Sequence, residues 1–429
     1  MSVPSYDAIV VGARVAGATT ALLLAQRGYQ VLLLDQARFP SGTLSTHLFF
    51  TDTMDVFERI GVLDRVLAVD APRLRRLRFP YVDAPFAEQH GRDFALCIRR
   101  EVLDEILAAA AAAHPNIELR TGMRVTGLLW AGERVSGVRF RPVGGAEEDV
   151  ARARVVIGAD GQHSRVARET GAPCYDAVPP MFAWYYGYFA GVPLDDPPSA
   201  WAVRGSYLAV GADYAAAFVF PCDAGLTLVG FGVQHDAFPR FRQRYREHYL
   251  EGIRLMPGIV ERLGAAELAG PIYGTADLPN FLRRPHGPGW ALVGDAGCHK
   301  DPHTVQGIGD ATRSAVLLSA ALDACWQGAD ETSMLERYHL ARDADILPMY
   351  DFTVGRLEAS VEPEVWQAFA RRTWDDPALA RQRVAAMAHA VNPAGVYAEP
   401  VVRALAAAET RSDSRPHVAE SPLPEVRNR

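Results

Sequence analysis

The sequence predicts an α/β fold: a Rossmann-like nucleotide-binding domain, an inserted sheet that is mainly antiparallel, and a helical C-terminal region. Three apolar segments each run directly into a signature of glycine and aspartate, at residues 12–17, 159–161 and 294–295. Residues 181–233 alternate aromatic and small side chains between Pro, Asp and Gly turns, which is typical of antiparallel strands. From Gly309 onward the pattern is helical, although we expect prolines to interrupt it at Pro348 and Pro363.

The first signature lies in a strand–helix–strand unit. Tyr6 to Gly12 is a short apolar strand, Ala16 to Arg27 a helix closed by Gly28, and Val31 to Leu34 a second strand that ends at Asp35. In such a unit the helix N-terminus offers free N–H groups and a positive dipole end to a pyrophosphate. We therefore favour nucleotide binding over an ordinary strand–helix turn.

Four residues of this unit carry the prediction. Gly12 permits the tight turn and Gly17 lets the helix pack closely, while the carboxylate of Asp35 can accept hydrogen bonds from ribose hydroxyls. Arg14 occupies the position of the usual second glycine. Its side chain either obstructs the phosphate or lies outward and pairs with it.

The middle signature follows the apolar segment 155–158. Asp160 and Gly161 are followed by Ser164 and Arg165, whose side chains can orient anionic groups. The alternative is structural: an Asx turn in which Ser164 caps a short helix that carries Arg168.

The late signature follows the apolar segment 290–293. Asp295 is placed to hold a polyol hydroxyl, and glycines at 307 and 309 allow the backbone to approach a flat ring. The helix that starts after Gly307 can direct its N-terminus at negative charge on a reduced flavin. Each signature alone is weak evidence, but the three in this order predict one shared FAD.

Two further regions complete the predicted organisation. Residues 100–113 form an Ala-rich helix, and residues 117–140 a meander of strands. Aromatic side chains of the inserted sheet are candidates to cover the flavin: Trp184, Tyr185, Tyr186, Tyr188, Trp201, Tyr207, Phe218 and Phe220. Because side chains alternate along a strand, only one face reaches the ligand, and half or more of these residues would serve ordinary packing.

Composition excludes several classes of protein. The 429 residues are 49% hydrophobic and 22% charged with a net charge of −7, which gives no basic surface for nucleic acid. No apolar run is long enough to span a bilayer, and residues 1–5 lack a signal segment, so we expect a cytoplasmic protein. The cysteines are scattered singly, which suits reduced thiols better than disulfides or a zinc site: Cys97, Cys174, Cys222, Cys298 and Cys325.

With these motifs in order, the chain resembles the FAD-dependent monooxygenases of the para-hydroxybenzoate hydroxylase superfamily, which also contains flavin halogenases and geranylgeranyl-type reductases. The resemblance implies a glutathione-reductase-like FAD domain and adds two motifs. Arg100 with Leu103 and Asp104 is similar to a family helix whose arginine lies near the flavin, and Val125 falls where the family places a backbone contact to adenine. The implied FAD contacts are Gly12, Arg14, Ala16, Gly17, Asp35, Gln36, Arg100, Val125, Asp160, Gly161, Asp295, Pro302, Gly307 and Ile308.

The resemblance also implies domain limits. We expect a discontinuous FAD-binding domain, a substrate-binding sheet domain, C-terminal helices and a loose tail. Their limits are 1–75, 95–175 and 280–345 for the first, 76–94 and 176–279 for the second, 346–409 for the helices and 410–429 for the tail.

One loop departs from the phenol hydroxylases of the superfamily. Ser45, Thr46 and His47 stand where those enzymes have an arginine-rich flavin loop, and they look more like a branch shared with reductases. His47 is the one candidate catalytic side chain, able to contact the flavin or a substrate oxygen. The alternative is a structural histidine.

The resemblance implies hydroxylation or epoxidation of an apolar or aromatic small molecule, with NAD(P)H as transient reductant and O2 reacting through a C4a-hydroperoxyflavin. The substrate pocket is predicted at Trp184, Tyr186, Tyr188, Trp201 and Phe220, with no metal. A second dinucleotide fingerprint is not visible, so either the nicotinamide visits transiently or a separate flavin reductase supplies electrons; a homodimer is also compatible.

Three alternatives remain open. A C=C reductase of the geranylgeranyl type is the first, because of the loop at residues 45–47. A halogenase is the second, but we expect Lys300, the single lysine, to face phosphate or solvent rather than carry a halogen. The third is a flavin-binding protein without catalysis.

Overall fold

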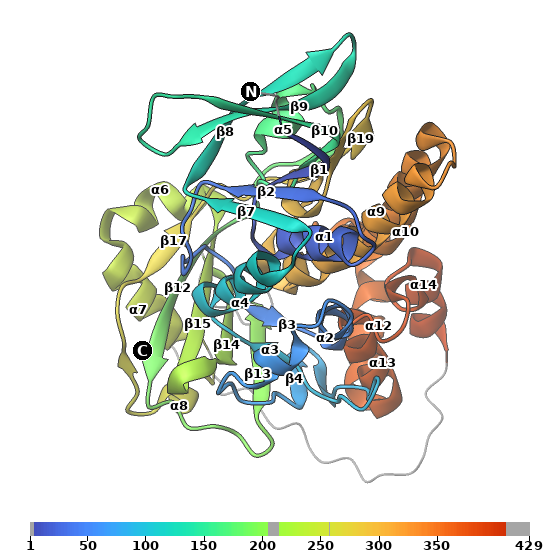
Figure 1. Cartoon of the computed structure of the whole chain (residues 1–429). Coiled ribbons are helices and arrows are strands. Elements are labelled where there is room, and N and C mark those ends of the chain that lie inside the picture. Colours follow the sequence, from blue (N-terminus) through green and yellow to red (C-terminus); the bar gives the residue numbers. More distant parts are fainter. Residues whose placement is uncertain (1–3, 205–213, 257, 409–429) are drawn as a thin grey trace.

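The computed structural model describes residues 4–204, 214–256 and 258–408 (Figure 1). Within them the predicted fold class is confirmed: a Rossmann-like α/β domain, an antiparallel sheet and a helical C-terminal region. The expectations for Tyr207 and for the tail at 410–429 lie outside the described residues.

The first sheet forms the core of the α/β domain. Its strands follow the order β19-β20-β10-β1-β2-β7, and β8 and β9 extend it as a hairpin beside β10. The four strands β20, β10, β1 and β2 pair in parallel, as does β7 with β2, so residues 117–121 belong to the main sheet rather than to a meander. The bounds are β1 Ser5–Val11, β2 Val31–Asp35, β7 Ile117–Thr121, β8 Met123–Ala131, β9 Arg134–Pro142, β10 Asp149–Gly158, β19 His286–Gly287 and β20 Trp290–Leu292.

Helices cover both faces of this sheet. On one face α1, α4, α9 and α10 bury an aliphatic core, and on the other α5 packs beneath the β8–β9 hairpin (Figure 1). The strands that face these layers are continuous runs of Val, Ile and Leu, because parallel strands covered on both faces have no polar side. The bounds are α1 Val15–Ala25, α4 Arg100–Ala113, α5 Arg165–Glu169, α9 Gly307–Trp326 and α10 Glu331–Thr353.

The second sheet has the order β16-β12-β15-β14-β13-β4-β5, with β17 also paired to β12. It is antiparallel except where β4 runs parallel to β13. Strands β4 and β5 come from residues 76–85, far in sequence from the rest of the sheet. The bounds are β4 Arg76–Phe79, β5 Val82–Pro85, β12 Phe182–Ala190, β13 Ser199–Arg204, β14 Tyr214–Pro221, β15 Leu226–Gln234, β16 Glu267–Leu268 and β17 Tyr273–Thr275.

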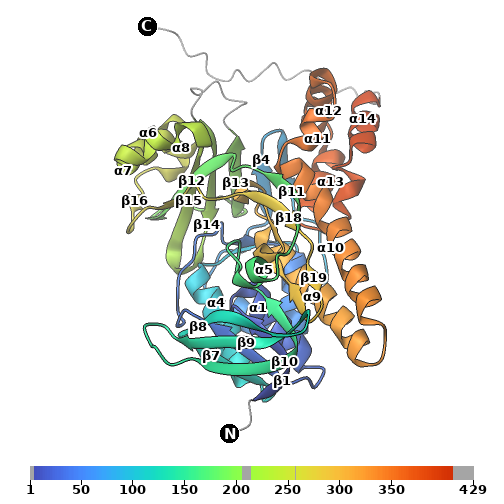
Figure 2. The same ribbon diagram turned by 90° about the horizontal axis from the view of Figure 1, so that it is seen from above.

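The two faces of the second sheet have different neighbours. One packs toward the C-terminal helices and the other is covered by α6, α7 and α8. Figure 2 shows the second sheet and the C-terminal helices at the end of the molecule opposite to β8 and β9. The remaining helices are α2 Thr51–Arg59, α3 Leu63–Leu67, α6 Phe238–Phe241, α7 Tyr245–Leu255, α8 Ile259–Leu263, α11 Arg356–Ala359, α12 Pro363–Asp375, α13 Pro377–Met387 and α14 Glu399–Ala407.

Two small sheets complete the described structure. One pairs β3 Leu48–Phe49 with β6 Leu96–Cys97, and the other contains β11 Cys174–Val178, β18 Asn280–Arg283 and β21 Cys298–His299.

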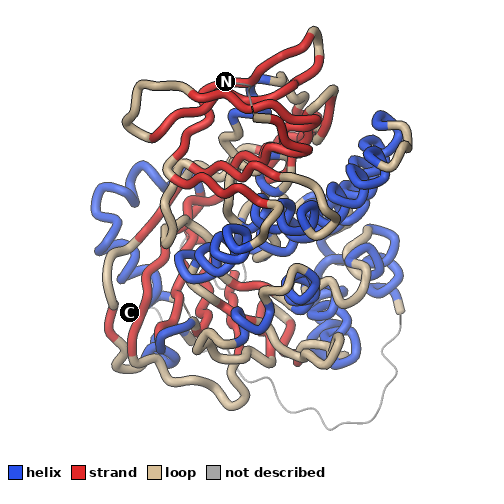
Figure 3. The backbone as a smooth tube through the Cα atoms, viewed as in Figure 1, coloured by secondary structure: helices blue, strands red, loops and turns tan. Residues whose placement is uncertain are grey.

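The prolines of the C-terminal region behave differently from each other. Pro363 begins α12, where its missing N–H has no helical partner to lose. The expectation for Pro348 was wrong, because it lies inside α10, which continues to Thr353. Figure 3 shows that the C-terminal region is mainly helical. Met349 and Tyr350 beside Pro348 are fully buried, and this packing holds the helix across the lost hydrogen bond. Among the described helices, none combines the length and apolar character that a bilayer span requires.

Candidate active site

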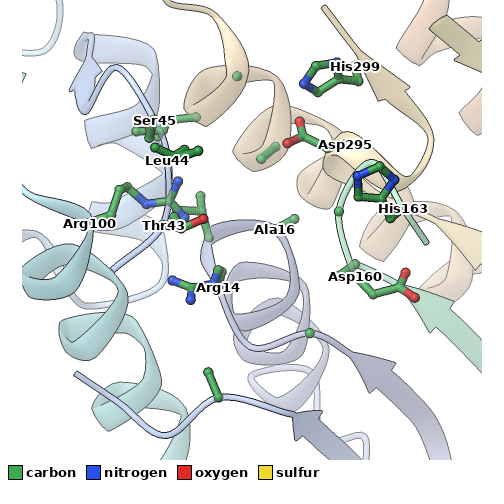
Figure 4. Close-up of a pocket in the computed structure, with 18 of the residues that line it drawn as sticks. Arg14, Ala16, Thr43, Leu44, Ser45, Arg100, Asp160, His163, Asp295 and His299 are labelled. Atoms are coloured by element: carbon green, nitrogen blue, oxygen red, sulfur yellow. The ribbon is translucent and has the colours of Figure 1, made fainter. Parts of the chain in front are cut away.

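One cavity of about 650 Å³ receives residues from all three signatures. Figure 4 shows Arg14, Arg100 and the loop from Thr43 to Ser45 on one side of it, and Asp160 and Asp295 on the other. Its size falls in the range of small-molecule sites, about 300–1,000 Å³. The topology therefore brings together three segments that are far apart in sequence.

The first glycine turn is built by close backbone contacts. Gly12 has a φ of +102°, and a Cβ there would lie 2.3 Å from the carbonyl oxygen of Ala159. A Cβ on Gly17 would lie 1.7 Å from the Gly12 oxygen, so only glycine lets α1 start this close to the strands. Gly12 and Ala16 line the cavity, whereas Gly17 acts through this packing.

The side chain of Arg14 is held by polar partners within the protein. Its guanidinium donates to Asp104 Oδ2 at 2.5 Å and to the backbone oxygen and Oγ of Ser41, each at 3.0 Å. Arg100 donates to the same carboxylate at 2.9 Å, and Asp104 is fully buried between the two arginines. Arg14 thus joins the glycine turn, the loop after β2 and α4, although part of its side chain still lines the cavity.

Asp35 ends β2 at the cavity wall. Its Oδ2 accepts from the N–H of Ala13 and its Oδ1 from that of Ala37, both at 2.7 Å. These bonds fix the carboxylate beside the first turn and leave one lone pair on each oxygen for a ligand. Gln36, next to it, is exposed to the cavity, which Val125 also lines.

The middle signature forms the structural arrangement that was the alternative. Asp160 accepts from the hydroxyl of Ser164 at 2.5 Å and from the N–H of Arg165 at 2.7 Å, and Ser164 caps α5 through the N–H of Ala167. Burial raises the pKa of Asp160. Asp160 and Gly161 border the cavity, but the carboxylate is engaged within the protein.

The carboxylate of Asp295, unlike that of Asp160, is not engaged within the described part of the protein. No hydrogen bond or ion pair within the described residues engages its side chain, which faces the cavity (Figure 4). Asp295 is exposed to the cavity, where desolvation by the surrounding protein raises the pKa of this carboxyl while His299 and Arg100 act to lower it. Gly307 and Ile308 present the N-terminus of the 20-residue helix α9 to the same cavity, which Pro302 also lines.

Lys300 lines the cavity, but little of its side chain reaches solvent, and the expectation that it faces phosphate stays a prediction. Its side chain is 3% exposed, and Nζ donates to Asp310 Oδ2 at 2.5 Å. Asp310 also accepts from Arg313, which binds Asp52 and Asp345. The lysine therefore belongs to a buried ion cluster at the start of α9.

The aromatic residues of the second sheet divide between its faces. Four of the predicted residues line the cavity: Trp184, Tyr185, Tyr186 and Phe218. Trp184 Nε1 donates to Asp301 Oδ1 at 3.0 Å. Other residues predicted for the pocket do not line it. Phe220 stacks on Phe218 within the core at 4.6 Å, and Trp201 lies on the opposite face, under the guanidinium of Arg262.

Comparison with known proteins agrees with this geometry. The family model described as FAD binding domain matches residues 5–203. Tryptophan 2-halogenase of Chondromyces crocatus is 25% identical over 348 residues, 79% of this chain and 65% of that protein, so just under two thirds of that relative is spanned. Digeranylgeranylglycerophospholipid reductase of Methanosarcina acetivorans is 26% identical over 79% of this chain and 80% of its own. The solved structure of the myxobacterial chondrochloren halogenase has a TM-score of 0.75 at 25% identity, covering 82% of this chain and 83% of that one.

This chain is an FAD-binding flavoprotein. Its relatives include halogenases, geranylgeranyl-type reductases and monooxygenases, and it is an FAD-dependent oxidoreductase. Its own residues fit the cofactor. Two helix N-termini, those of α1 and α9, end on the cavity, and Asp295 offers a carboxylate without a partner in the described residues.

His47 of the flavoprotein does not line the cavity. It is 1% exposed with a φ of 62°, its Nε2 lies 2.6 Å from the hydroxyl of Tyr188, and its Nδ1 has no hydrogen bond. Burial, with the nearby charges of Arg100 and Arg99, lowers the pKa of His47 to about 3. The imidazole is neutral near pH 7 and stands behind the cavity wall with Tyr188, which was also predicted for the pocket.

Several cavity residues of the flavoprotein escaped the sequence analysis. Arg124 and Arg168 line it without a side-chain partner among the described residues, and they add positive charge for a pyrophosphate. His163 and His299 line it as well; His299 Nδ1 is bonded to the carbonyl of Pro279, which leaves Nε2 for a ligand. Arg168 and His163 lay beside the middle signature, but no spacing rule distinguished them from ordinary surface residues.

Proposed function

We propose that the flavoprotein is a monooxygenase that takes electrons from NADH or NADPH and uses O2 to hydroxylate or epoxidise an apolar or aromatic small molecule in secondary or catabolic metabolism. The observation that carries this proposal is the shared cavity. Trp184, Tyr186 and Phe218 border the same space as Asp295 and Gly307. An aromatic substrate stacked on these rings would lie beside the cofactor, away from bulk water.

The residues of the chain have separate tasks in this proposal. Bound FAD supplies the redox and oxygen chemistry. Asp295 would hold the cofactor, and the N-terminus of α9 would stabilise negative charge on the reduced ring. The hydrogen bond from Trp184 to the buried Asp301 fixes the aromatic wall against the loop that follows Asp295, and so orients a substrate.

The buried ion pair between Lys300 and Asp310 favours oxygenation over halogenation. A lysine that carries a halogen needs the lone pair of a free amine. In the structure Nζ of Lys300 already donates to Asp310 Oδ2 at 2.5 Å within a buried pair, so this amine is engaged by the protein.

The second candidate is a C=C reductase. The similarity to the archaeal reductase over 79% of this chain supports it, together with the loop at residues 45–47. In that reaction the aromatic wall would hold an alkene, and O2 would not be consumed.

The two candidates separate in one experiment. The holoprotein is incubated with NADH or NADPH and a panel of phenols, aromatic heterocycles and prenyl compounds, under ¹⁸O₂ and under anaerobic conditions. We expect O2-dependent NAD(P)H oxidation and one ¹⁸O atom in the product. A product formed without O2 and heavier by two hydrogens would establish the reductase, and a product that requires halide would establish the halogenase. Parallel reactions with a flavin reductase test the external electron supply.

A further inference from the structure

A cluster of metal-ligating side chains lies outside the cavity, where α10 packs on the edge strand β19 (Figure 1). His286 comes from β19, and Glu336 and His339 come from one turn of α10. His286 Nε2 lies 3.1 Å from Glu336 Oε2, and His339 Nδ1 lies 3.8 Å from Glu336 Oε1. One ligand atom from each residue lies within 4.8 Å of the other two.

These separations are close to those of a bound ion. With bonds of about 2.0–2.1 Å, the ligand atoms of tetrahedral Zn²⁺ lie about 3.3 Å apart. Small side-chain movements would bring the ligand atoms of the three residues to the separation of about 3.3 Å. The carboxylate of Glu336 is free to make them, because its side chain is 45% exposed, whereas His286 is 4% exposed and fixed.

The hydrogen bonding of His339 prepares one nitrogen as a ligand. Its Nε2 lies 3.3 Å from Asp343 Oδ2, and a proton on Nε2 would be held there. The other nitrogen, Nδ1, is buried and has no hydrogen bond in the described structure. A carboxylate behind a histidine that presents its second nitrogen is the arrangement that orients histidine ligands in zinc sites.

The neighbouring charges permit a cation. Arg284 Nη2 is 3.9 Å from Glu336 Oε2, but this arginine is 51% exposed and has room to turn toward solvent. Asp343 is paired with Arg342 at 2.6 Å and remains behind the ring of His339. Glu336 therefore supplies the negative charge that faces the ion.

We propose that His286, Glu336 and His339 bind one Zn²⁺ ion, with water in the fourth position on the exposed side. Two imidazole nitrogens and one carboxylate oxygen match the ligand types of zinc. The ion would join α10 to β19, which pairs with β20, and β20 leads directly into Gly294 and Asp295. The site thus stabilises the strand edge behind the FAD cavity, independently of the proposed reaction.

The test uses the full-length flavoprotein without an affinity tag, treated with EDTA and desalted. Zinc chloride is added, excess metal is removed by gel filtration, and zinc and FAD are quantified per chain. We expect one zinc per chain, and a melting temperature about 3 °C higher at a free zinc concentration of 100 times the Kd. His339→Ala should weaken zinc binding at least tenfold and abolish the thermal shift.

Two further variants keep the outcome decisive. Glu336→Gln changes an exposed side chain and should retain the fold, judged by its FAD content, while zinc affinity falls. His90→Ala is the matched control, since His90 is an exposed histidine paired with Asp55 at 2.9 Å, and it should bind zinc like the wild type. Wild-type protein that retains no zinc, or a Glu336→Gln variant that binds it with unchanged affinity, would overturn the proposal.

Discussion

Asp160 and Asp295 each follow a strand of the same sheet and each lie beside a glycine, but their carboxylates have opposite surroundings. Asp160 accepts hydrogen bonds from Ser164 and Arg165 and closes the start of α5. Asp295 has no such partner among the described residues and faces the cavity. From this difference in internal hydrogen bonds we propose that Asp160 maintains the fold and that Asp295 contacts the ligand.

Arg14 and His47 extend the comparison. Both were candidates for ligand contact, and both have polar partners inside the protein, Asp104 and Tyr188. If internal partners mark structural residues, changes at these positions should alter stability more than FAD affinity. Substitutions at Asp295, His47, Arg14 and Asp160 test this rule.

Asp295→Ala should have the largest effect on the cofactor. Hydrogen bonds to a charged group contribute about 1.5–3 kcal/mol, so FAD affinity should fall about 10–100-fold. The protein should be purified with little bound flavin, measured from its absorbance at 450 nm relative to 280 nm. Full FAD occupancy would refute the site.

His47→Gln should change the pH dependence of stability. The folded-state pKa of about 3 lies below the ordinary value of 6.5, so the unfolded chain binds the proton first as the pH falls through this window. Wild-type protein should therefore lose about 2 kcal/mol of unfolding free energy from this residue at pH 5. Denaturant titrations at pH 7.5 and 5 should show a smaller loss in the variant, with His90→Gln as the exposed control. An unchanged pH slope would show that His47 is not buried as a neutral group.

Arg14→Ala should destabilise the protein by about 1–2 kcal/mol. Loss of one partner of a buried pair costs about 3–5 kcal/mol, but Arg100 still binds Asp104 in this variant. Chemical denaturation measures the loss. If FAD affinity falls more than the free energy of unfolding, Arg14 contacts the ligand and does not serve the fold alone.

Asp160→Ala should have the smallest effect, about 1 kcal/mol, because it removes a capping interaction from the short helix α5. Thermal unfolding of the apo protein detects it. Asp160→Asn should recover part of the stability, since its amide oxygen can still accept from the N–H of Arg165. No recovery would indicate that the charge itself matters.

The order of elements was predictable because each signature follows an apolar run that can only be a buried strand, as in 8–11, 155–158 and 290–293. The directions of side chains were not. Trp184 and Trp201 are alike in sequence context, but strand register places them on opposite faces of one sheet. His47 adopts a left-handed φ, which histidine tolerates better than most residues but still adopts too rarely to be predicted from its identity. Pro348 lies within a helix because tertiary packing outweighs the local preference.

A titration of three apo proteins with FAD separates a contact of Asp295 with FAD from a structural role of Asp160. Flavin fluorescence gives the Kd for wild type, Asp295→Ala and Asp160→Ala, and thermal unfolding is recorded on each apo protein before FAD is added, because bound FAD would itself shift the melting temperature. We predict a Kd at least tenfold higher with an unchanged melting temperature for Asp295→Ala, and the reverse pattern for Asp160→Ala. Equal losses of FAD affinity in the two variants would show that Asp160 and Asp295 do not differ in this way.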